Sequence, residues 1–409
     1  MSLSSFATEP NDKLLLNLMS EDELIMRAIL SEDKEDYINT QLYFSSLYKK
    51  TNKKEYLYKE VMGGIFANTN TNKYIKKIEF LKNIDNDDLI VKRLLISLYL
   101  KDEKIDKAKE ITNELINSSD NSLDLEFASN TYIIIQDYNS AIKLLNRAYN
   151  KNFEEEILLK LVAILVVYQQ KDIEAIMKLE THKRMVESSS DILKYLVDLY
   201  IQTSDSKNLV KTYKELYLME RDDVYFNNII DIYLKYKNYK SAIEFLELDG
   251  EHLEILYELY KIDKNFNKAF LLAKKIYKAT NNAIWLAELG VLNFEKYTSI
   301  DKEDTLILKE SIKYFEKALK LGVDDSIYLN YYGYTLIDKS IDIDKGINIV
   351  KRAVKQQPNN SYFLDSLAWG YYKKQDCQKA YNIMKKIVDK DIYEDEINIH
   401  WNKIKDCID

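Results

Sequence analysis

The chain has 409 residues, a formal net charge of −8, and only two prolines and eight glycines. This length exceeds what one compact core needs, and so few helix-breaking residues favour long helices, either in several domains or in a repeat array. Acidic and basic residues are interleaved along most of the sequence. This pattern argues against nucleic acid as the main ligand, because phosphate binding needs a basic stripe.

The first ten residues, MSLSSFATEP, lack the features of a signal peptide, since they contain neither a basic segment nor an apolar core. We expect residues 1–10 to be a disordered leader or a cloning remnant. The protein is then either cytosolic or present in a processed form.

Helices are expected in pairs that recur about every 33 or 34 residues from residue 11 to residue 407. Near the N-terminus the predicted pairs are 21–30 with 35–51 and 54–67 with 71–84. The longest apolar run, 157–168, is too short to span a bilayer and predicts a buried helix. A tyrosine marks the same position of the first helix in six pairs: Tyr99, Tyr132, Tyr200, Tyr233, Tyr260 and Tyr371. Small or compact residues mark the second helices: Ala108, Ala141, Ala175, Ala242, Ala269, Ser311, Gly346 and Ala380.

Two irregularities interrupt this period. The unit that contains Ala242 is short, and its second helix is predicted to end at Gly250 as a glycine C-cap would end it. An insertion between Gly290 and Ser311 lengthens the helices or the turn of another unit. A single helix over 394–407 is expected to cap the last pair, as solenoids require.

The C-terminal third identifies the kind of repeat. Leu364, Leu367 and Tyr371 surround Ala368, and the next small residue, Ala380, follows twelve residues later. This spacing is that of the 34-residue tetratricopeptide repeat (TPR), whose two antiparallel helices cross closely at small residues. We therefore predict an all-α, TPR-like right-handed α-solenoid of about eleven helical pairs plus a C-terminal capping helix. Residues 11–281 are expected to form a degenerate array, and residues 282–409 consensus-like units with the capping helix.

Residues 329–388 and 395–401 resemble more than a generic TPR. They are similar to the C-terminal region of a bacterial family of TPR proteins, many of them periplasmic lipoproteins anchored to the outer membrane. The sequence departs from that family's pattern at Ala368, where glycine is usual, and at Trp401, where leucine is usual. The matching residues are Leu329, Asn330, Gly333, Tyr334, Leu336, Asp338, Leu364, Asp365, Ser366, Leu367, Trp369, Tyr372, Glu396, Ile397 and His400.

The resemblance implies a non-enzymatic scaffold or adaptor in the bacterial envelope. Members of this family bind other proteins, and one kind binds a carboxyl-terminal processing protease and delivers substrates to it. A partner protein is therefore expected, with membrane attachment only through an N-terminal lipid anchor that this sequence does not contain. The alternative is a cytosolic TPR regulator or peptide sensor, although residues 1–50 lack the helix-turn-helix that such sensors usually carry.

No pattern indicates catalysis, a cofactor or a metal. The three histidines, His182, His252 and His400, lie in different units without a further ligand at zinc-binding spacing. We expect His182 to be a surface residue and His400 to pack in the capping helix. The phosphate-binding and nucleophile motifs GxGxxG, GxxxxGK[ST] and GxSxG are absent from the sequence.

A candidate partner-binding site follows from the TPR register, in which the first helix of each unit lines the concave surface. In the last two full units this assigns aromatic rings that would cover apolar side chains and polar groups that would bond a peptide backbone. The alternative is that Trp369 and Tyr334 pack against the inserted unit or the capping helix. The predicted site residues are Asn330, Tyr334, Tyr362, Asp365, Trp369 and Tyr372.

The two cysteines are predicted to lie near each other. Cys377 falls in the turn of the last unit, and the capping helix should return Cys407 to the same turn. We expect Cα atoms about 4.4–6.8 Å apart, as a disulfide needs. Such a bond persists in an oxidising compartment such as the periplasm, whereas the alternative is two unrelated thiols.

Overall fold

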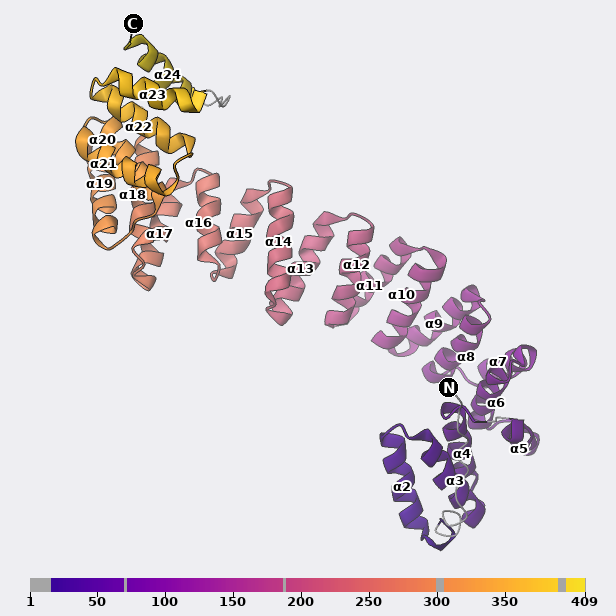
Figure 1. Ribbon diagram of the computed structural model, residues 1–409. Helices are drawn as coiled ribbons and strands as arrows, with labels where there is room; N and C mark the ends of the chain where they lie inside the picture. The colour runs from indigo at the N-terminus through magenta and orange to yellow at the C-terminus, as the bar shows by residue number, and fades with distance from the viewer. Residues whose placement is uncertain (1–15, 70–71, 187–188, 299–304, 389–394, 409) are drawn as a thin grey trace. The chain divides into compact units, whose positions relative to one another are not determined.

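The computed structural model describes residues 16–69, 72–186, 189–298, 305–388 and 395–408. Within these ranges every regular element is an α-helix and there is no strand (Figure 1). Helices α2 to α23 follow one another mostly as two-helix hairpins, such as α8 with α9 and α20 with α21, and α24 comes after the last hairpin. The predicted all-α, TPR-like fold is confirmed. The leader predicted over residues 1–10 lies outside the described residues.

The protein divides into two compact units, Met1–Phe226 and Asn227–Asp409. The first unit contains α2 (Glu21–Asp33), α3 (Tyr37–Thr51), α4 (Lys54–Phe66), α5 (Asn72–Ile84), α6 (Leu89–Lys101), α7 (Ile105–Ser118), α8 (Ser122–Ile134), α9 (Tyr138–Asn152), α10 (Glu155–Gln169), α11 (Asp172–Met185), α12 (Ser190–Gln202) and α13 (Ser206–Glu220). The boundary falls in α14 (Asp223–Lys235). The second unit continues with α15 (Tyr239–Asp249), α16 (Leu253–Ile262), α17 (Phe266–Thr280), α18 (Ile284–Thr298), α19 (Thr305–Lys320), α20 (Ser326–Asp338), α21 (Ile343–Gln356), α22 (Ser361–Lys373), α23 (Cys377–Val388) and α24 (Asp395–Asp406).

The turn inside most pairs has one chemistry. A non-glycine residue with positive φ ends the first helix, and an Asp or Asn follows it as N-cap of the second, as at Gln136 and Asp137. The backbone carbonyl of each of the six marker tyrosines accepts a hydrogen bond from the N–H five residues later, for example from Asp137 to Tyr132 at 2.8 Å. This is the Schellman arrangement, which satisfies carbonyls that would otherwise be orphaned at a helix end.

The hydroxyls of several marker tyrosines join one pair to the preceding pair. Tyr200 on α12 donates to Glu180 on α11 at 2.8 Å, and Tyr260 on α16 donates to Glu247 on α15 at 2.6 Å. Tyr99 on α6 donates to Glu79 on α5 in the same way. The marker position therefore serves both the turn and the contact between successive pairs, which explains why a tyrosine recurs there.

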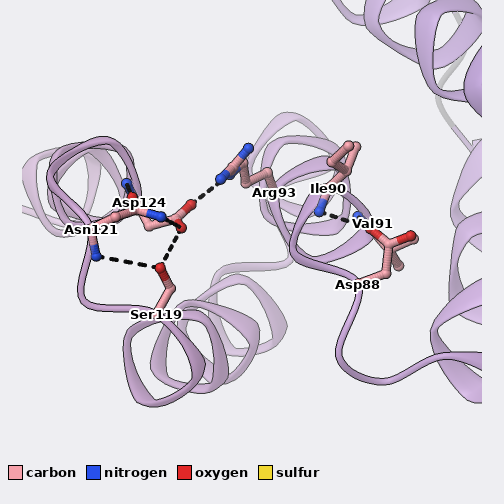
Figure 2. A network of polar contacts seen from close by, with 7 residues as sticks. All are labelled: Asp88, Ile90, Val91, Arg93, Ser119, Asn121 and Asp124. Carbon is pink, nitrogen blue, oxygen red and sulfur yellow. Dashed lines mark hydrogen bonds and ion pairs between the residues drawn. The ribbon is translucent and has the colours of Figure 1, made fainter.

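A buried polar network also connects first helices of the first unit (Figure 2). The Asp124 carboxylate on α8 is fully buried and accepts from Arg93 Nε on α6 at 2.5 Å. Ser119 and Asn121 donate to its second oxygen at 2.6 and 2.7 Å. Burial alone would raise the pKa of Asp124, but these bonds, led by the one from Arg93, hold it below its ordinary value.

The predicted end of the short unit and the predicted buried helix over 157–168 are confirmed, whereas the predicted pairing of α4 with α5 is wrong. Helix α15 ends at Asp249 with Gly250 as a left-handed C-cap, as expected for the short unit. The buried helix predicted over 157–168 is α10. Helix α4, predicted to pair with α5, packs mainly on α3 and α6. Its Gly63 allows this because an added Cβ would lie 3.0 Å from the Gln41 backbone nitrogen of α3. Every helix within the described ranges is too short or too polar to cross a bilayer.

Candidate functional site

A pocket of about 830 Å³ lies in the second unit among α18, α20, α22 and α24. The first helices of three successive pairs supply three of its walls, and the capping helix supplies the fourth. Five of the six residues predicted from the sequence line it: Asn330, Tyr334, Tyr362, Asp365 and Trp369. The sixth, Tyr372, lies behind the wall, where its ring stacks on Trp369 with centroids 4.8 Å apart.

Helical spacing brings these side chains to one face of each helix. Asn330, Tyr334 and Asp338 are four residues apart on α20, as Asp365 and Trp369 are on α22. Contact between the backbones of α20 and α21 fixes the position of α20. A Cβ on Gly346 would lie 2.7 Å from the Gly333 carbonyl oxygen, so side chains are excluded from this crossing.

Trp369 forms the floor of the pocket and is only 4% exposed. Its indole stacks on His400 of α24 with centroids 4.0 Å apart and planes inclined by 16°. The indole N–H donates to the Asp338 carboxylate at 3.1 Å. Burial would raise the pKa of Asp338, but bonds from Lys339 and Trp369 keep it lowered. Trp369 is thus a packed aromatic that contacts the capping helix and also faces the pocket.

Tyr334 contacts both the inserted unit and the capping helix, the two packing partners expected for it if it were not a binding residue. Its ring meets Phe294 of α18 edge to face, with centroids 6.2 Å apart. Its hydroxyl donates to Glu396 of α24. Burial, reinforced by Glu396, raises the pKa of Tyr334 well above that of a free tyrosine, so the hydroxyl remains a donor. The capping helix is therefore held by the same rings that line the pocket.

A buried Asp–His pair lies beside the Trp369 ring. His400 Nδ1 is 3.0 and 2.9 Å from the two oxygens of Asp365, and both residues are buried. Burial raises the pKa of Asp365, and the contact with His400 opposes the rise without cancelling it. The pair joins α22 to α24 and places His400 in the packing of the capping helix, as expected.

Two features of the pocket were not predicted. Tyr331 donates to Glu295 of α18 at 3.2 Å, and burial together with Glu295 raises the pKa of Tyr331 to about 12. The Oδ1 of Asn330 is buried and has no hydrogen-bond partner among the described residues. The repeat register could have identified Glu295 as a pocket residue, because it follows Gly290 by five residues, just as Asp338 follows Gly333. The insertion after Gly290 obscured that equivalence.

A disulfide joins Cys377, at the start of α23, to Cys407, next to the end of α24, with Cα atoms 5.7 Å apart. It links residues thirty apart in the sequence. Because α24 contributes Glu396, Ile399, His400 and Lys403 to the pocket, the bond restrains the helix that completes the site.

The prediction that His182 is a surface residue is wrong. Its side chain is fully buried, and Nδ1 lies 2.8 Å from the Tyr149 hydroxyl. His182 lies on the face of α11 whose last turn contacts Tyr149 of α9. His252 contacts Asp249 at 2.7 Å. In the described part of the protein, no three His, Cys, Asp or Glu side chains are grouped as a metal site would require.

This protein matches no protein-family model and no curated protein. Its helical repeats are similar to those of solved structures. YrrB, a TPR protein with an unusual peptide-binding site, is 16% identical with a TM-score of 0.34, over 47% of this protein and 97% of that one. The APC/C hetero-tetramer Cut9–Hcn1 gives 12% identity and a TM-score of 0.34 over 96% of this protein and 98% of that one.

A third structure, Naa15/Naa10 bound to HypK-THB, is 14% identical with a TM-score of 0.33. That match covers 92% of this protein but only 64% of the other. Identities and TM-scores this low carry no statement about function.

Proposed function

We propose that this protein is a non-enzymatic protein-interaction scaffold whose second unit binds an extended segment of another protein in the pocket among α18, α20, α22 and α24. The pocket itself carries the proposal, because first helices of three successive pairs line it and Tyr362 at its wall is 54% exposed. Polar groups that line such a pocket can bond the backbone of an extended segment. The neighbouring rings of Tyr334 and Tyr362 offer apolar surface to the side chains of such a segment.

We further propose an envelope location, with the protein acting as a periplasmic adaptor anchored to the outer membrane by a processed lipid-bearing leader. The resemblance of residues 329–388 to periplasmic TPR lipoproteins supports this, and so does the Cys377–Cys407 disulfide, since such bonds persist in oxidising compartments. Delivery of substrates to a carboxyl-terminal processing protease is the partner relationship that the same resemblance implies.

Site-directed photo-crosslinking in the native cell tests the binding proposal. A photoreactive phenylalanine analogue replaces Tyr362, a pocket residue that is 54% exposed, and in a control variant it replaces Leu218, which is 66% exposed in the first unit. We expect one protein to crosslink at 362 and not at 218, and competition by a synthetic peptide from its crosslinked segment. Identical crosslinked proteins at both positions would overturn the proposal.

Cell fractionation separates the envelope proposal from its alternative, a cytosolic TPR regulator. A periplasmic protein should be released with the periplasm or the outer membrane, and should carry no free thiols when denatured without reductant. Recovery in the cytosol with two free thiols would support the regulator instead.

A further inference from the structure

The charges that line the pocket do not balance. Its walls carry four carboxylates, two lysines and His400. Asp338 pairs with Lys339 at 2.9 Å, and Asp365 is bonded to His400. These contacts leave the carboxylates of Glu295 and Glu396 without a cationic partner in the described ranges. The remaining cation, Lys403, lies over the Trp369 ring, with its ammonium 5.3 Å from the centroid.

The two uncompensated carboxylates lie at the ends of one aromatic ridge. Tyr331 and Tyr334, three residues apart on α20, donate to Glu295 and Glu396 respectively. Within the described residues each carboxylate accepts only this one hydroxyl bond, although it can accept several more. Tyr331 and Tyr334 both meet the ring of Phe294 edge to face. Two acceptor groups therefore flank a cluster of three aromatic rings.

We propose that this pocket receives an arginine side chain of the bound segment, with the guanidinium hydrogen-bonded to Glu295 or Glu396 beside the rings of Phe294, Tyr331 and Tyr334. The inference rests on the function proposed above and specifies the ligand. A planar guanidinium suits the site because it donates to carboxylates in a bidentate manner and stacks on aromatic rings. An acidic segment, or the terminal carboxylate of a partner protein, would meet two unpaired carboxylates and be repelled.

Lysine is a weaker candidate for the same position. Its ammonium is a compact and strongly hydrated charge, and it neither stacks nor donates in a fork. Segments with lysine in place of arginine should bind, but less tightly. This order of preference distinguishes recognition of a guanidinium from general attraction to positive charge.

The test uses the full-length oxidised protein and pools of capped nonapeptides with random flanking positions. The central residue is arginine, lysine, glutamate or citrulline, the neutral isostere of arginine. We expect the arginine pool to bind about tenfold more tightly than the citrulline pool, because a charge-assisted hydrogen bond is then lost. The lysine pool should fall between them, and the glutamate pool should bind least. Isothermal titration or fluorescence anisotropy provides the measurement.

Glu295→Gln and Glu396→Gln should each reduce the advantage of arginine over citrulline, and the double variant should abolish it. Glu247→Gln is the matched control, since that glutamate also accepts a tyrosine hydroxyl but does not line the pocket. Equal binding of arginine and citrulline pools overturns the arginine proposal and leaves the proposed function intact. Failure of every pool to bind, or binding that is insensitive to Tyr362→Ala, overturns both.

Discussion

The pairs α8–α9 and α20–α21 occupy equivalent places in the repeat but cross in different ways. In the first unit the crossing is lined by small residues that still carry a Cβ, Ser129 and Ala141, both of which are fully buried. In the second unit Gly333 and Gly346 replace them, and even one methyl group would meet backbone or side-chain atoms below 3.0 Å. The two helices of a pair can therefore cross with room for a side chain, as in α8–α9, or too closely for even a methyl group, as in α20–α21.

The polar groups of the two regions differ in a corresponding way. On the first helices of the first unit they bond one another between pairs, as Glu126 of α8 does with Lys160 of α10 at 3.1 Å. In the second unit Glu295 and Glu396 line the pocket and have no cationic partner in the described ranges. Carboxylates that join successive pairs in one region therefore keep unused acceptor capacity in the other.

The largest effect is expected at the disulfide, for which the first unit has no counterpart. Cys407→Ser, or reduction, should lower the free energy that keeps α24 docked by roughly 3–4 kcal/mol, because a bond across a loop of about thirty residues restricts the unfolded polypeptide. Hydrogen exchange should accelerate in α24 and leave α8 and α9 unchanged. Equal exchange in the oxidised and reduced forms would show that α24 is held by its packing alone.

The glycine crossing should be the next most sensitive position. Gly346→Ala adds a methyl 2.7 Å from both the Gly333 carbonyl oxygen and Ile337 Cγ1. We expect a loss of about 2–3 kcal/mol from overpacking, since alanine's gain in helix propensity is at most about 1 kcal/mol. Ala141→Gly in the first unit should cost only about 1 kcal/mol. Urea unfolding provides both values, and similar losses for the two variants would contradict the proposed difference between the crossings.

The sequence predicted the helices well because each marker residue has a local task. A recurring tyrosine reflects both the Schellman turn and the hydroxyl bond between pairs, as Tyr200 shows. The pocket was only partly predictable. Trp369 follows from the register of its own helix, whereas its partners His400 and Asp338 belong to two other helices. His182 was misjudged because its short polar surroundings, THKRM, do not reveal which face of α11 is buried.

Within the pocket, an exposed side chain should contribute mainly to partner binding, whereas a buried one should contribute to both binding and stability. Tyr362→Ala should weaken binding of a partner segment by about 1–2 kcal/mol with little change in unfolding, because more than half of that ring is exposed. Trp369→Ala should affect both measurements, since it also removes the contact with His400. Titration of the crosslinked partner's peptide, together with urea unfolding, provides the comparison. Loss of stability in Tyr362→Ala would place that ring in the core instead.

The smallest effect concerns the tyrosine–carboxylate contact, which both units use between pairs. Tyr99→Phe should cost about 1 kcal/mol at neutral pH, as loss of a hydrogen bond to a charged group does. The bond from Tyr99 is the first cause of the lowered pKa of Glu79, with Lys107 assisting and burial opposing. A lowered pKa in the folded state means that this stabilisation is present above the ordinary glutamate value of 4.5 and is lost as pH falls through the folded value.

The difference in unfolding free energy between the wild-type protein and Tyr99→Phe should therefore shrink on acidification, as urea unfolding at pH 7 and at about pH 3 would measure. Tyr132→Phe is the matched control, because that hydroxyl donates at 2.8 Å to the neutral amide oxygen of Asn113. Its cost should not depend on pH over the same range. Tyr332→Phe in the second unit should show a weaker pH dependence than Tyr99→Phe, since Lys345 is the first cause of the lowered pKa of Glu316. A pH dependence of equal size in all three variants would mean that acid weakens the array as a whole and that the carboxylate contacts contribute nothing of their own.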